Sequence, residues 1–273
     1  MQEKIGNVTL DYEYYPGEDL YSDGPVEEEL LEIAKNYQEK ELNQLIYERN
    51  SWPVLYHFSH IRQNILEWLP ITKEQNVLEI GSGCGPITGV LARKAKSVTC
   101  IDLSKMRSTI NAYRNRECDN VKIMVGNFQD VESSLTEKYD YITLIGVFEY
   151  SQGYIGTAQP YVEMLRRIAR HLAPGGRIVI AIENRLGLKY WAGCTEDHVG
   201  KYFEGLENYP DTRSVRTFSR KELSDIIDQA GAFRTTFYYP FPDYKLPMTV
   251  YSDRRLPLKG ELNRLETNYD RLR

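Results

Sequence analysis

Nine residues decide the fold: Val77-Leu78-Glu79-Ile80-Gly81-Ser82-Gly83-Cys84-Gly85. A short apolar run ends here in three alternating glycines, and residues 87–96 follow with the apolar spacing of a helix. Glycine adopts positive φ angles without steric cost and lets a ligand approach the backbone closely. The stretch therefore predicts a strand, a ligand-binding loop and a helix, in this order.

Three types of glycine-rich loop compete for this stretch. A phosphate-binding P-loop requires G-x-x-x-x-G-K-[ST], and the missing lysine excludes it. A nicotinamide-binding loop, G-x-G-x-x-G, would need its third glycine where Pro86 stands, so this alternative is weakened but stays open. Every position fits the third type, the E-x-G-x-G-x-G loop of class I methyltransferases. Its acid, Glu79, would repel a pyrophosphate and favour a cationic ligand.

Outward from the glycines, short apolar runs alternate with helical patterns. The expected strands are 77–80, 98–101, 121–125, 139–146 and 177–183, followed by 235–239 and 248–251, and the expected helices between them are 87–96, 105–115 and 160–172. This alternation predicts an α/β fold: a Rossmann-like, seven-stranded, mostly parallel sheet with helices on both faces. Ligands bind such sheets at the carboxyl ends of the strands.

The flanking regions differ in pattern from this core. Residues 5–15 alternate like a strand, and 26–50 and 54–68 read as helices, which makes residues 1–70 a strand-and-helix appendage that could cap the active site. We expect the methyltransferase domain at 71–253. The charged tail, 254–273, is expected to be helical and could begin a further region of a longer chain. A long polar and aromatic loop, 184–217, is expected to form a lid. After it, Ser219 and Glu222 have the spacing of a capping box, which predicts a helix that runs to about Ala230.

Two further anchors follow the second and third expected strands. Asp102 stands 21 residues after Gly81 at a strand end, where a carboxylate can accept both ribose hydroxyls; the alternative is that it only caps the next helix. Together with the glycine loop, these motifs resemble class I S-adenosylmethionine-dependent methyltransferases over about residues 73–252. The resemblance implies that Asn127 and Phe128 hold the adenine. The implied cofactor-binding residues are Glu79, Gly81, Gly83, Gly85, Asp102, Leu103, Asn127, Phe128 and Gly146.

The sequence gives weaker evidence on the residues that would bind the methyl acceptor. Where family members often carry Glu-His, this chain has Glu149-Tyr150, so His198 in the long loop is the better candidate base. The expected catalytic residues are therefore His198, Tyr150 and Glu149. A hydroxyl acceptor needs a base, whereas a phosphate or carboxylate acceptor does not, and the sequence leaves both open.

A second resemblance concerns the substrate. Residues 183–190 and 241–247 resemble methyltransferase modules associated with surface-polysaccharide glycosyltransferases. The expected function is transfer of a methyl group from S-adenosylmethionine to an oxygen of a small-molecule or glycan acceptor, in polysaccharide biosynthesis. The alternative from another class is a non-catalytic module that binds the cofactor and regulates or scaffolds a larger assembly.

The composition of the chain indicates which binding partners and which cellular compartment to expect. A formal net charge of −5 argues against a general nucleic-acid binder, and no apolar run is long enough to insert into a membrane. The four cysteines are scattered, which indicates reduced thiols in a cytoplasmic protein. His57 and His60 stand three residues apart without a clear acidic partner, so no metal site is expected.

Overall fold

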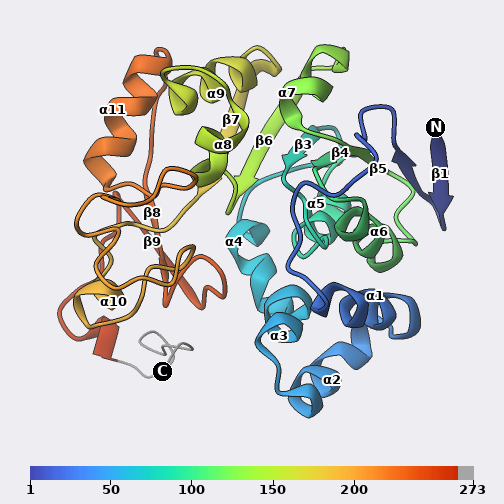
Figure 1. Cartoon of the computed structure of the whole chain (residues 1–273), viewed down its shortest axis with the longest axis horizontal. Helices are drawn as coiled ribbons and strands as arrows, with labels where there is room; N and C mark the ends of the chain where they lie inside the picture. The colour runs from blue at the N-terminus through green and yellow to red at the C-terminus, as the bar shows by residue number, and fades with distance from the viewer. Residues whose placement is uncertain (264–273) are drawn as a thin grey trace. The chain divides into compact units, whose positions relative to one another are not determined.

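The computed structural model describes residues 1–263, which form two compact units (Figure 1). Unit 1 comprises Met1–Thr143, Leu172–Val179 and Lys245–Met248, and unit 2 comprises the other described residues. The glycine loop lies in unit 1. The expected catalytic residues lie in unit 2.

A seven-stranded sheet has the order β1-β2-β5-β4-β3-β6-β7. Its strands are β1 (Gln2–Ile5), β2 (Val8–Asp11), β3 (Asn76–Ile80), β4 (Ser97–Asp102), β5 (Val121–Val125), β6 (Tyr139–Ile145) and β7 (Leu172–Ala181). β1 runs antiparallel to β2, whereas the pairs β2–β5, β5–β4 and β4–β3 are parallel. The central strands read as apolar runs because parallel sheets are buried on both faces. The expected Rossmann-like, mostly parallel fold is confirmed.

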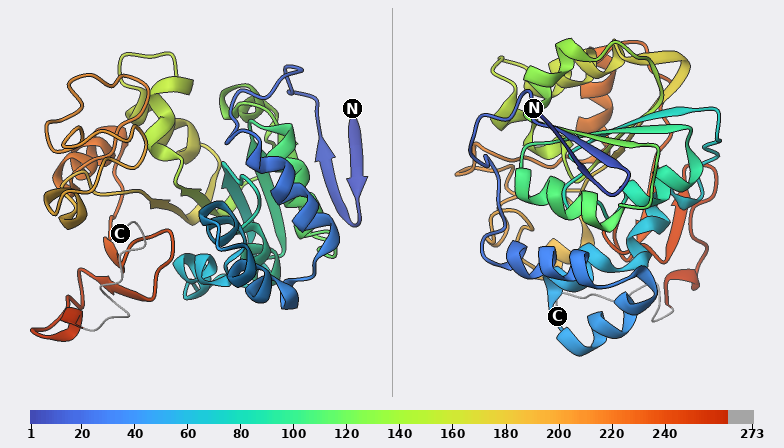
Figure 2. Two further views of the ribbon diagram at one scale, coloured as in Figure 1. Left: turned by 60° about the horizontal axis from the view of Figure 1, so that its bottom comes forward. Right: turned by 90° about the vertical axis from the view of Figure 1, so that its right-hand side faces the viewer.

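The membership of this sheet differs from the expectation. Residues 5–15 do not form one strand; Gly6, at φ +59°, turns the chain into the hairpin of β1 and β2, which forms one edge of the sheet (Figure 2). A Cβ atom at Gly6 would lie 2.3 Å from the carbonyl oxygen of Arg116, so only glycine fits. The last two expected strands, β8 (Tyr238–Phe241) and β9 (Thr249–Ser252), pair with each other in a separate sheet.

The expected helices of the alternating region are present. They are α5 (Thr88–Lys94), α6 (Lys105–Arg114), α9 (Pro160–Ala169) and α11 (Arg220–Ala230). Ser219 and Glu222 form the capping box that the sequence indicates before α11. The short helical elements are α7 (Phe128–Val131), η3 (Glu132–Ser134), η4 (Phe148–Tyr150), α8 (Ser151–Tyr154), α10 (Leu188–Trp191) and η5 (Glu261–Asn263). The expected C-terminal helix over 254–273 is not formed in its described half, where only η5 is helical within 254–263, and residues 264–273 lie outside the described residues.

The N-terminal helices are shorter than their periodicity predicts. The expected helix over 26–50 divides into α1 (Val26–Asn36), η1 (Glu39–Glu41) and α2 (Leu42–Arg49), and that over 54–68 into α3 (Trp52–Phe58), η2 (His60–Gln63) and α4 (Asn64–Glu67). Gln38 and Ser59 cause the breaks. Both have extended backbones, and each side chain accepts a backbone N–H of the short helix that follows.

These helices share a hydrophobic core with the glycine loop. Leu30 and Ile33 of α1 and Phe58 of α3 pack together with Cys84 of the loop and Ile110 of α6. All five side chains are almost fully buried. The N-terminal region is therefore joined to the glycine loop by apolar packing rather than by a loose linker.

Two properties bear on the expectations from composition. Among the described helices, none is long and apolar enough to span a membrane. All four cysteines are free thiols.

His57 is a buried titratable group in this N-terminal core. It is 3% exposed, and its Nε2 atom lies 3.6 Å from Asp23. Burial lowers the pKa of His57 to about 4; the charges of Arg107 and Arg62 act in the same direction, and Asp23 acts against them. The imidazole is therefore neutral in the folded protein at neutral pH, in spite of its acidic neighbour.

This depressed pKa predicts a loss of stability in mild acid. The folded pKa lies below the unfolded value of 6.5, so the folded state binds fewer protons, and stability falls as the pH drops from 6.5 towards 4. The loss in unfolding free energy reaches about 3 kcal/mol. Urea unfolding across this pH range should show it in the wild type and much less of it in His57→Gln. The exposed His60 gives the control: His60→Gln should keep the wild-type slope, and an equal slope in all three proteins would contradict the assignment.

Candidate active site

The glycine loop has the backbone geometry that its sequence requires. Gly81, Gly83 and Gly85 all have positive φ angles, of 71°, 51° and 73°. A Cβ atom at Gly85 would lie 2.2 Å from Oδ1 of Asn111 in α6. A side chain at Gly85 would have to displace the buried amide side chain of Asn111 and adopt a positive φ, so glycine is strongly favoured there.

Asp102 connects this loop to the end of β4. Its Oδ2 accepts the Gly83 N–H at 2.7 Å, and its Oδ1 accepts the Ser104 N–H at 3.0 Å. Ser104, rather than Asp102, is the N-cap of α6, because its hydroxyl accepts the Arg107 N–H. Each Asp102 oxygen retains a further lone pair, so the carboxylate can still accept ribose hydroxyls.

The loop also offers an unused polar group. Ser82 is 3% exposed, and its hydroxyl has no hydrogen-bond partner among the described residues. Such a group is satisfied when a polar ligand binds beside it. The Ser82 hydroxyl, the half-buried Asp102 and the bare glycine backbone therefore fit a ligand with a ribose and polar ends, such as S-adenosylmethionine. Leu103, also expected at this site, is half-buried after Asp102.

Glu79 faces the protein interior. It is 4% exposed, and its Oε2 accepts the hydroxyl of Thr88 at 2.6 Å and the thiol of Cys100 at 3.4 Å. Asn111 donates to the same Thr88 hydroxyl at 3.0 Å. Burial raises the pKa of Glu79 to about 7. Glu79 thus links the strand, α5 and α6, and its direct contact with the cofactor stays a prediction.

Asn127 and Phe128 follow β5 as expected. The Asn127 Oδ1 atom accepts the Gln129 N–H at 3.1 Å and begins α7, and Phe128 is 6% exposed. The adenine contacts of both residues stay predictions. Gly126, just before them, is overlaid by Tyr14, since a Cβ atom at Gly126 would lie 2.8 Å from the Tyr14 carbonyl oxygen.

A second residue of the N-terminal segment reaches the same edge of unit 1. The carboxylate of Asp19 accepts the N–H groups of Lys105 and Met106 at the start of α6, at 2.6 and 3.1 Å, and the Ser104 hydroxyl at 2.8 Å. Acidic groups are stabilised at helix N-termini. Neither Tyr14 nor Asp19 belongs to a motif that predicts this position, because their partners lie far along the chain.

Gly146, the remaining expected cofactor residue, lies in unit 2. It has φ +71°, and a Cβ atom here would lie 2.8 Å from the hydroxyl of Tyr244. Tyr244 is 5% exposed and belongs to the 241–247 motif. Glycine is needed at position 146 because the Tyr244 side chain lies so close to its backbone. The contact of Gly146 with the cofactor stays a prediction.

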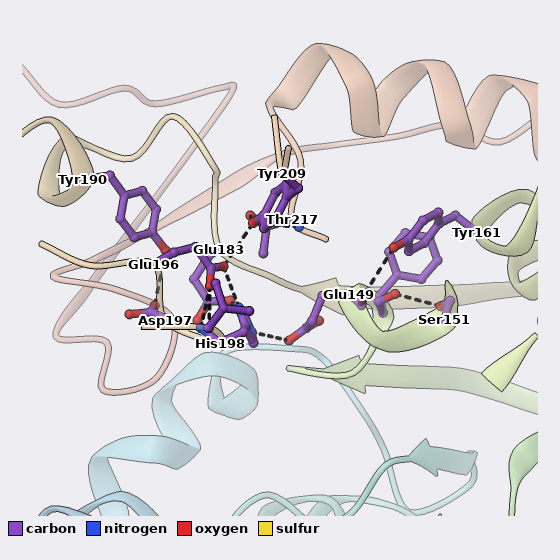
Figure 3. A network of polar contacts seen from close by, with 12 residues as sticks. Glu149, Ser151, Tyr161, Glu183, Tyr190, Glu196, Asp197, His198, Tyr209 and Thr217 are labelled. Carbon is purple, nitrogen blue, oxygen red and sulfur yellow. Dashed lines mark hydrogen bonds and ion pairs between the residues drawn. The ribbon is translucent and has the colours of Figure 1, made fainter. Parts of the chain in front are cut away.

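The three expected catalytic residues come together in unit 2, and Figure 3 shows two of them, Glu149 and His198. The Nε2 atom of His198 lies 3.5 Å from Oε1 of Glu149, and the Tyr150 ring lies edge-on to the imidazole at 5.5 Å between centroids. Two further acids join them: Glu183 at 3.7 Å from Nε2, and Glu196 at 2.8 Å from Nδ1. Neither acid has a role that its sequence motif predicts: Glu183 begins the 183–190 segment, and Glu196 stands two residues before His198. Their only signal was position, after β7 and beside His198.

This cluster is buried and mostly acidic. Glu149 is 1%, Glu183 5% and Glu196 2% exposed. Burial alone would lower the pKa of His198, but Glu149, Glu196 and the charge of Glu183 outweigh it and raise this pKa to about 10. Burial and the charge of Glu183 raise the pKa of Glu149. These acids favour the protonated form of the His198 imidazole, and the role of His198 as the catalytic base stays a prediction.

The loop over 184–217 is a folded segment that holds this cluster in place. The Tyr209 hydroxyl donates to Glu196 at 3.0 Å and contacts the Thr217 hydroxyl at 2.5 Å. Glu196 also accepts the backbone N–H groups of His198 and Val199. Burial would raise the pKa of Glu196, but the His198 imidazole and, after it, these two N–H groups keep this pKa below its usual value. The Glu196 carboxylate is thus charged and fixed, and it orients the imidazole ring.

Comparison with known proteins identifies the family. Residues 55–232 match the family model described as a methyltransferase domain. The chain belongs to this methyltransferase family. The expected enzyme class, an S-adenosylmethionine-dependent methyltransferase, is thereby confirmed, and S-adenosylmethionine is the cofactor. The loop of Gly81 to Gly85 with Asp102 is the part of unit 1 that fits it.

Individual relatives of this methyltransferase are distant. An uncharacterized methyltransferase of Staphylococcus carnosus is 26% identical over 61% of this chain and 74% of its own length. The ribosomal RNA small subunit methyltransferase A of Listeria monocytogenes is 34% identical over 88 residues, and the match spans 30% of this chain and 28% of that protein. A solved methyltransferase structure from Thermotoga maritima has 20% identity and a TM-score of 0.47, and covers 78% of this chain and 90% of its own. Sequence identities, coverages and a TM-score this low do not indicate which acceptor this methyltransferase uses.

Asp102 provides the first test of the cofactor site. Asp102→Ala should weaken binding of S-adenosylhomocysteine by about 2–3 kcal/mol, because a bidentate contact of a charged group with the ribose is lost. It should also lower the unfolding free energy by about 1–3 kcal/mol, because the N–H groups of Gly83 and Ser104 lose their acceptor. Titration calorimetry and urea unfolding measure the two effects.

Asp19 is the matched control, since it also supports the start of α6. Asp19→Ala should cost about 1 kcal/mol of stability and leave the affinity for S-adenosylhomocysteine unchanged. Unchanged affinity in Asp102→Ala as well would leave Asp102 with a purely structural role.

Proposed function

We propose that this methyltransferase moves the methyl group to a hydroxyl oxygen of a small-molecule or glycan acceptor in the cytoplasm. One observation carries the proposal. The Oε2 atom of Glu149 is buried and has no hydrogen-bond partner among the described residues. A buried carboxylate oxygen without a donor is costly, and a hydroxyl that donates to it removes this cost.

Glu149 is also suited to take the acceptor's proton. It lies in a cluster in which three carboxylates surround one imidazole, so positive charge is favoured there. S-adenosylmethionine supplies, when bound, a methyl group on a positively charged sulfur. Glu149 would orient the acceptor hydroxyl and take up its proton as the oxygen is methylated, and the cofactor would leave as the neutral thioether.

Exposed aromatic side chains in the same loop favour a glycan. Trp191 and Tyr202 are each 65% exposed, and Phe203 is 51% exposed. Large apolar side chains at the surface of a polar loop often mark a binding surface. Their flat faces suit the apolar faces of sugar rings. They support the glycan within the proposed acceptor class.

Two alternatives are kept as outcomes of the test. The ribosomal RNA methyltransferase relatives match less than a third of this chain, and the net charge of −5 disfavours nucleic acid. A non-catalytic module would bind the cofactor without turnover.

Radiolabelled S-adenosylmethionine should be offered to sugars, nucleotide sugars, lipid-linked glycans, proteins and nucleic acids. We expect label on a hydroxyl of a sugar compound. Label only on protein or nucleic acid would overturn the acceptor class, and cofactor binding without any labelled acceptor would support the module.

Glu149→Gln tests the proposed role of this carboxyl. With the labelled acceptor, kcat should fall by about 10²- to 10⁴-fold, because the amide cannot take a proton. Affinity for S-adenosylhomocysteine should stay at the wild-type value. The control is Glu204→Gln, a 4% exposed acid of unit 2 outside the cluster, whose Oε1 accepts the Thr212 hydroxyl. Glu204→Gln should keep wild-type turnover, and an equal kcat in both variants would remove Glu149 from the chemistry.

A further inference from the structure

We propose that Glu149, Glu183 and His198 form a binding site for one divalent metal ion. Each residue offers one ligand atom, and these atoms lie within 4.8 Å of one another. Among the described residues, these three side chains thus form a group that could hold a metal ion. The proposal rests on the proposed function in one respect only, namely that the ion would serve the acceptor site. It departs from the sequence-based expectation of no metal.

The geometry of His198 directs one nitrogen into the group. Its Nδ1 atom is engaged by Glu196 at 2.8 Å, which leaves Nε2 to face Glu149 at 3.5 Å and Glu183 at 3.7 Å. These two distances are longer than an ordinary hydrogen bond. Two atoms that each lie about 2.1 Å from the same ion can be up to about 4.2 Å apart. Both distances are therefore compatible with an ion between the atoms.

A second, independent observation points to a missing ligand. The Glu149 side chain is 1% exposed, its Oε1 faces His198, and its Oε2 lacks a hydrogen-bond partner among the described residues. Burial of an ionised carboxylate is expensive unless a cation or hydrogen bonds compensate it. A divalent ion would provide that compensation for Glu149 at the place where Glu183 and the imidazole meet it.

The surroundings of His198 match those of metal-binding histidines. Such a histidine usually donates its second ring N–H to a carboxylate, which fixes the ring and strengthens the ligand. Glu196 is in that position, and the hydroxyl of Tyr209 holds Glu196 in turn. The loop therefore provides both the ligand and the groups that orient it (Figure 3).

The ligand set indicates which ions fit. Two carboxylate oxygens and one imidazole nitrogen suit Mn²⁺ or Zn²⁺, whereas a site for soft ions would need sulfur ligands. Three protein ligands leave coordination positions open for oxygen atoms of water or of an acceptor. The proposed acceptor hydroxyl is such an oxygen ligand.

Binding of Mn²⁺ to the whole protein tests the site directly. After removal of metals with a chelator and dialysis, electron paramagnetic resonance should count one bound Mn²⁺ per chain, and the ion should raise the Tm. Glu183→Gln should lose both effects. Glu196→Gln should bind Mn²⁺ about 10- to 100-fold more weakly, as expected when a group that orients a ligand is changed. Glu204→Gln should bind Mn²⁺ like the wild type.

The controls separate this site from folding and from the proposed reaction. Binding of S-adenosylhomocysteine by Glu183→Gln shows that the variant is folded. A wild-type protein that binds neither Mn²⁺ nor Zn²⁺, or a Glu183→Gln variant that binds Mn²⁺ as tightly as the wild type, overturns the metal site. Labelling of a hydroxyl acceptor by that metal-free protein would leave the proposed function standing. Stoichiometric Mn²⁺ binding without any labelled hydroxyl acceptor would support the metal site and count against the function alone.

Discussion

Close contact between the glycine loop and helix α6 is the constraint on which the rest of unit 1 depends. Asn111 occupies the place where a Cβ atom at Gly85 would lie, so the helix can approach only because the loop lacks side chains. Asp102 then completes the contact by accepting N–H groups from the loop and from the start of the helix. The N-terminal region rests on this arrangement, because Asp19 supports α6 and the N-terminal helices pack on Cys84 of the loop.

The sequence predicts those features whose causes are local. The glycine loop, the strand before it and the capping box of Ser219 each follow from a few adjacent residues, and the structure has all three. The completion of the sheet has a cause far along the chain. The hairpin turn at Gly6 fits against Arg116, which is distant in sequence, and no pattern within residues 1–15 reveals that neighbour. Periodicity also missed the helix breaks at Gln38 and Ser59, because a polar side chain that accepts a backbone N–H competes with the helix without changing the apolar spacing.

In the candidate site, likewise, the sequence indicates where the residues lie but not how they ionise. Glu149 and His198 could be named from the sequence because one follows a strand and the other lies in a long polar loop, and the structure brings them together. The ionisation of His198 could not be inferred in this way. It depends on three carboxylates that come from separate parts of the chain, and their sum reverses the effect that burial alone would have on the pKa of the imidazole. The sequence thus indicates where His198 lies, whereas the acids that surround its imidazole are apparent only in the fold.

The arrangement around His198 argues against a purely structural role for the cluster. A buried group of charges that serves stability alone is often replaced by apolar side chains without loss, so it needs another reason to be kept. Here Tyr209, Thr217 and two backbone N–H groups are all used to fix Glu196, while Glu149, equally buried, keeps one oxygen without a donor among the described residues. An environment that satisfies one carboxylate fully and leaves its neighbour incomplete is suited to binding a ligand at the incomplete one. The acceptor chemistry that we propose therefore depends on the loop around Glu196 and on the residues just after β6 and β7.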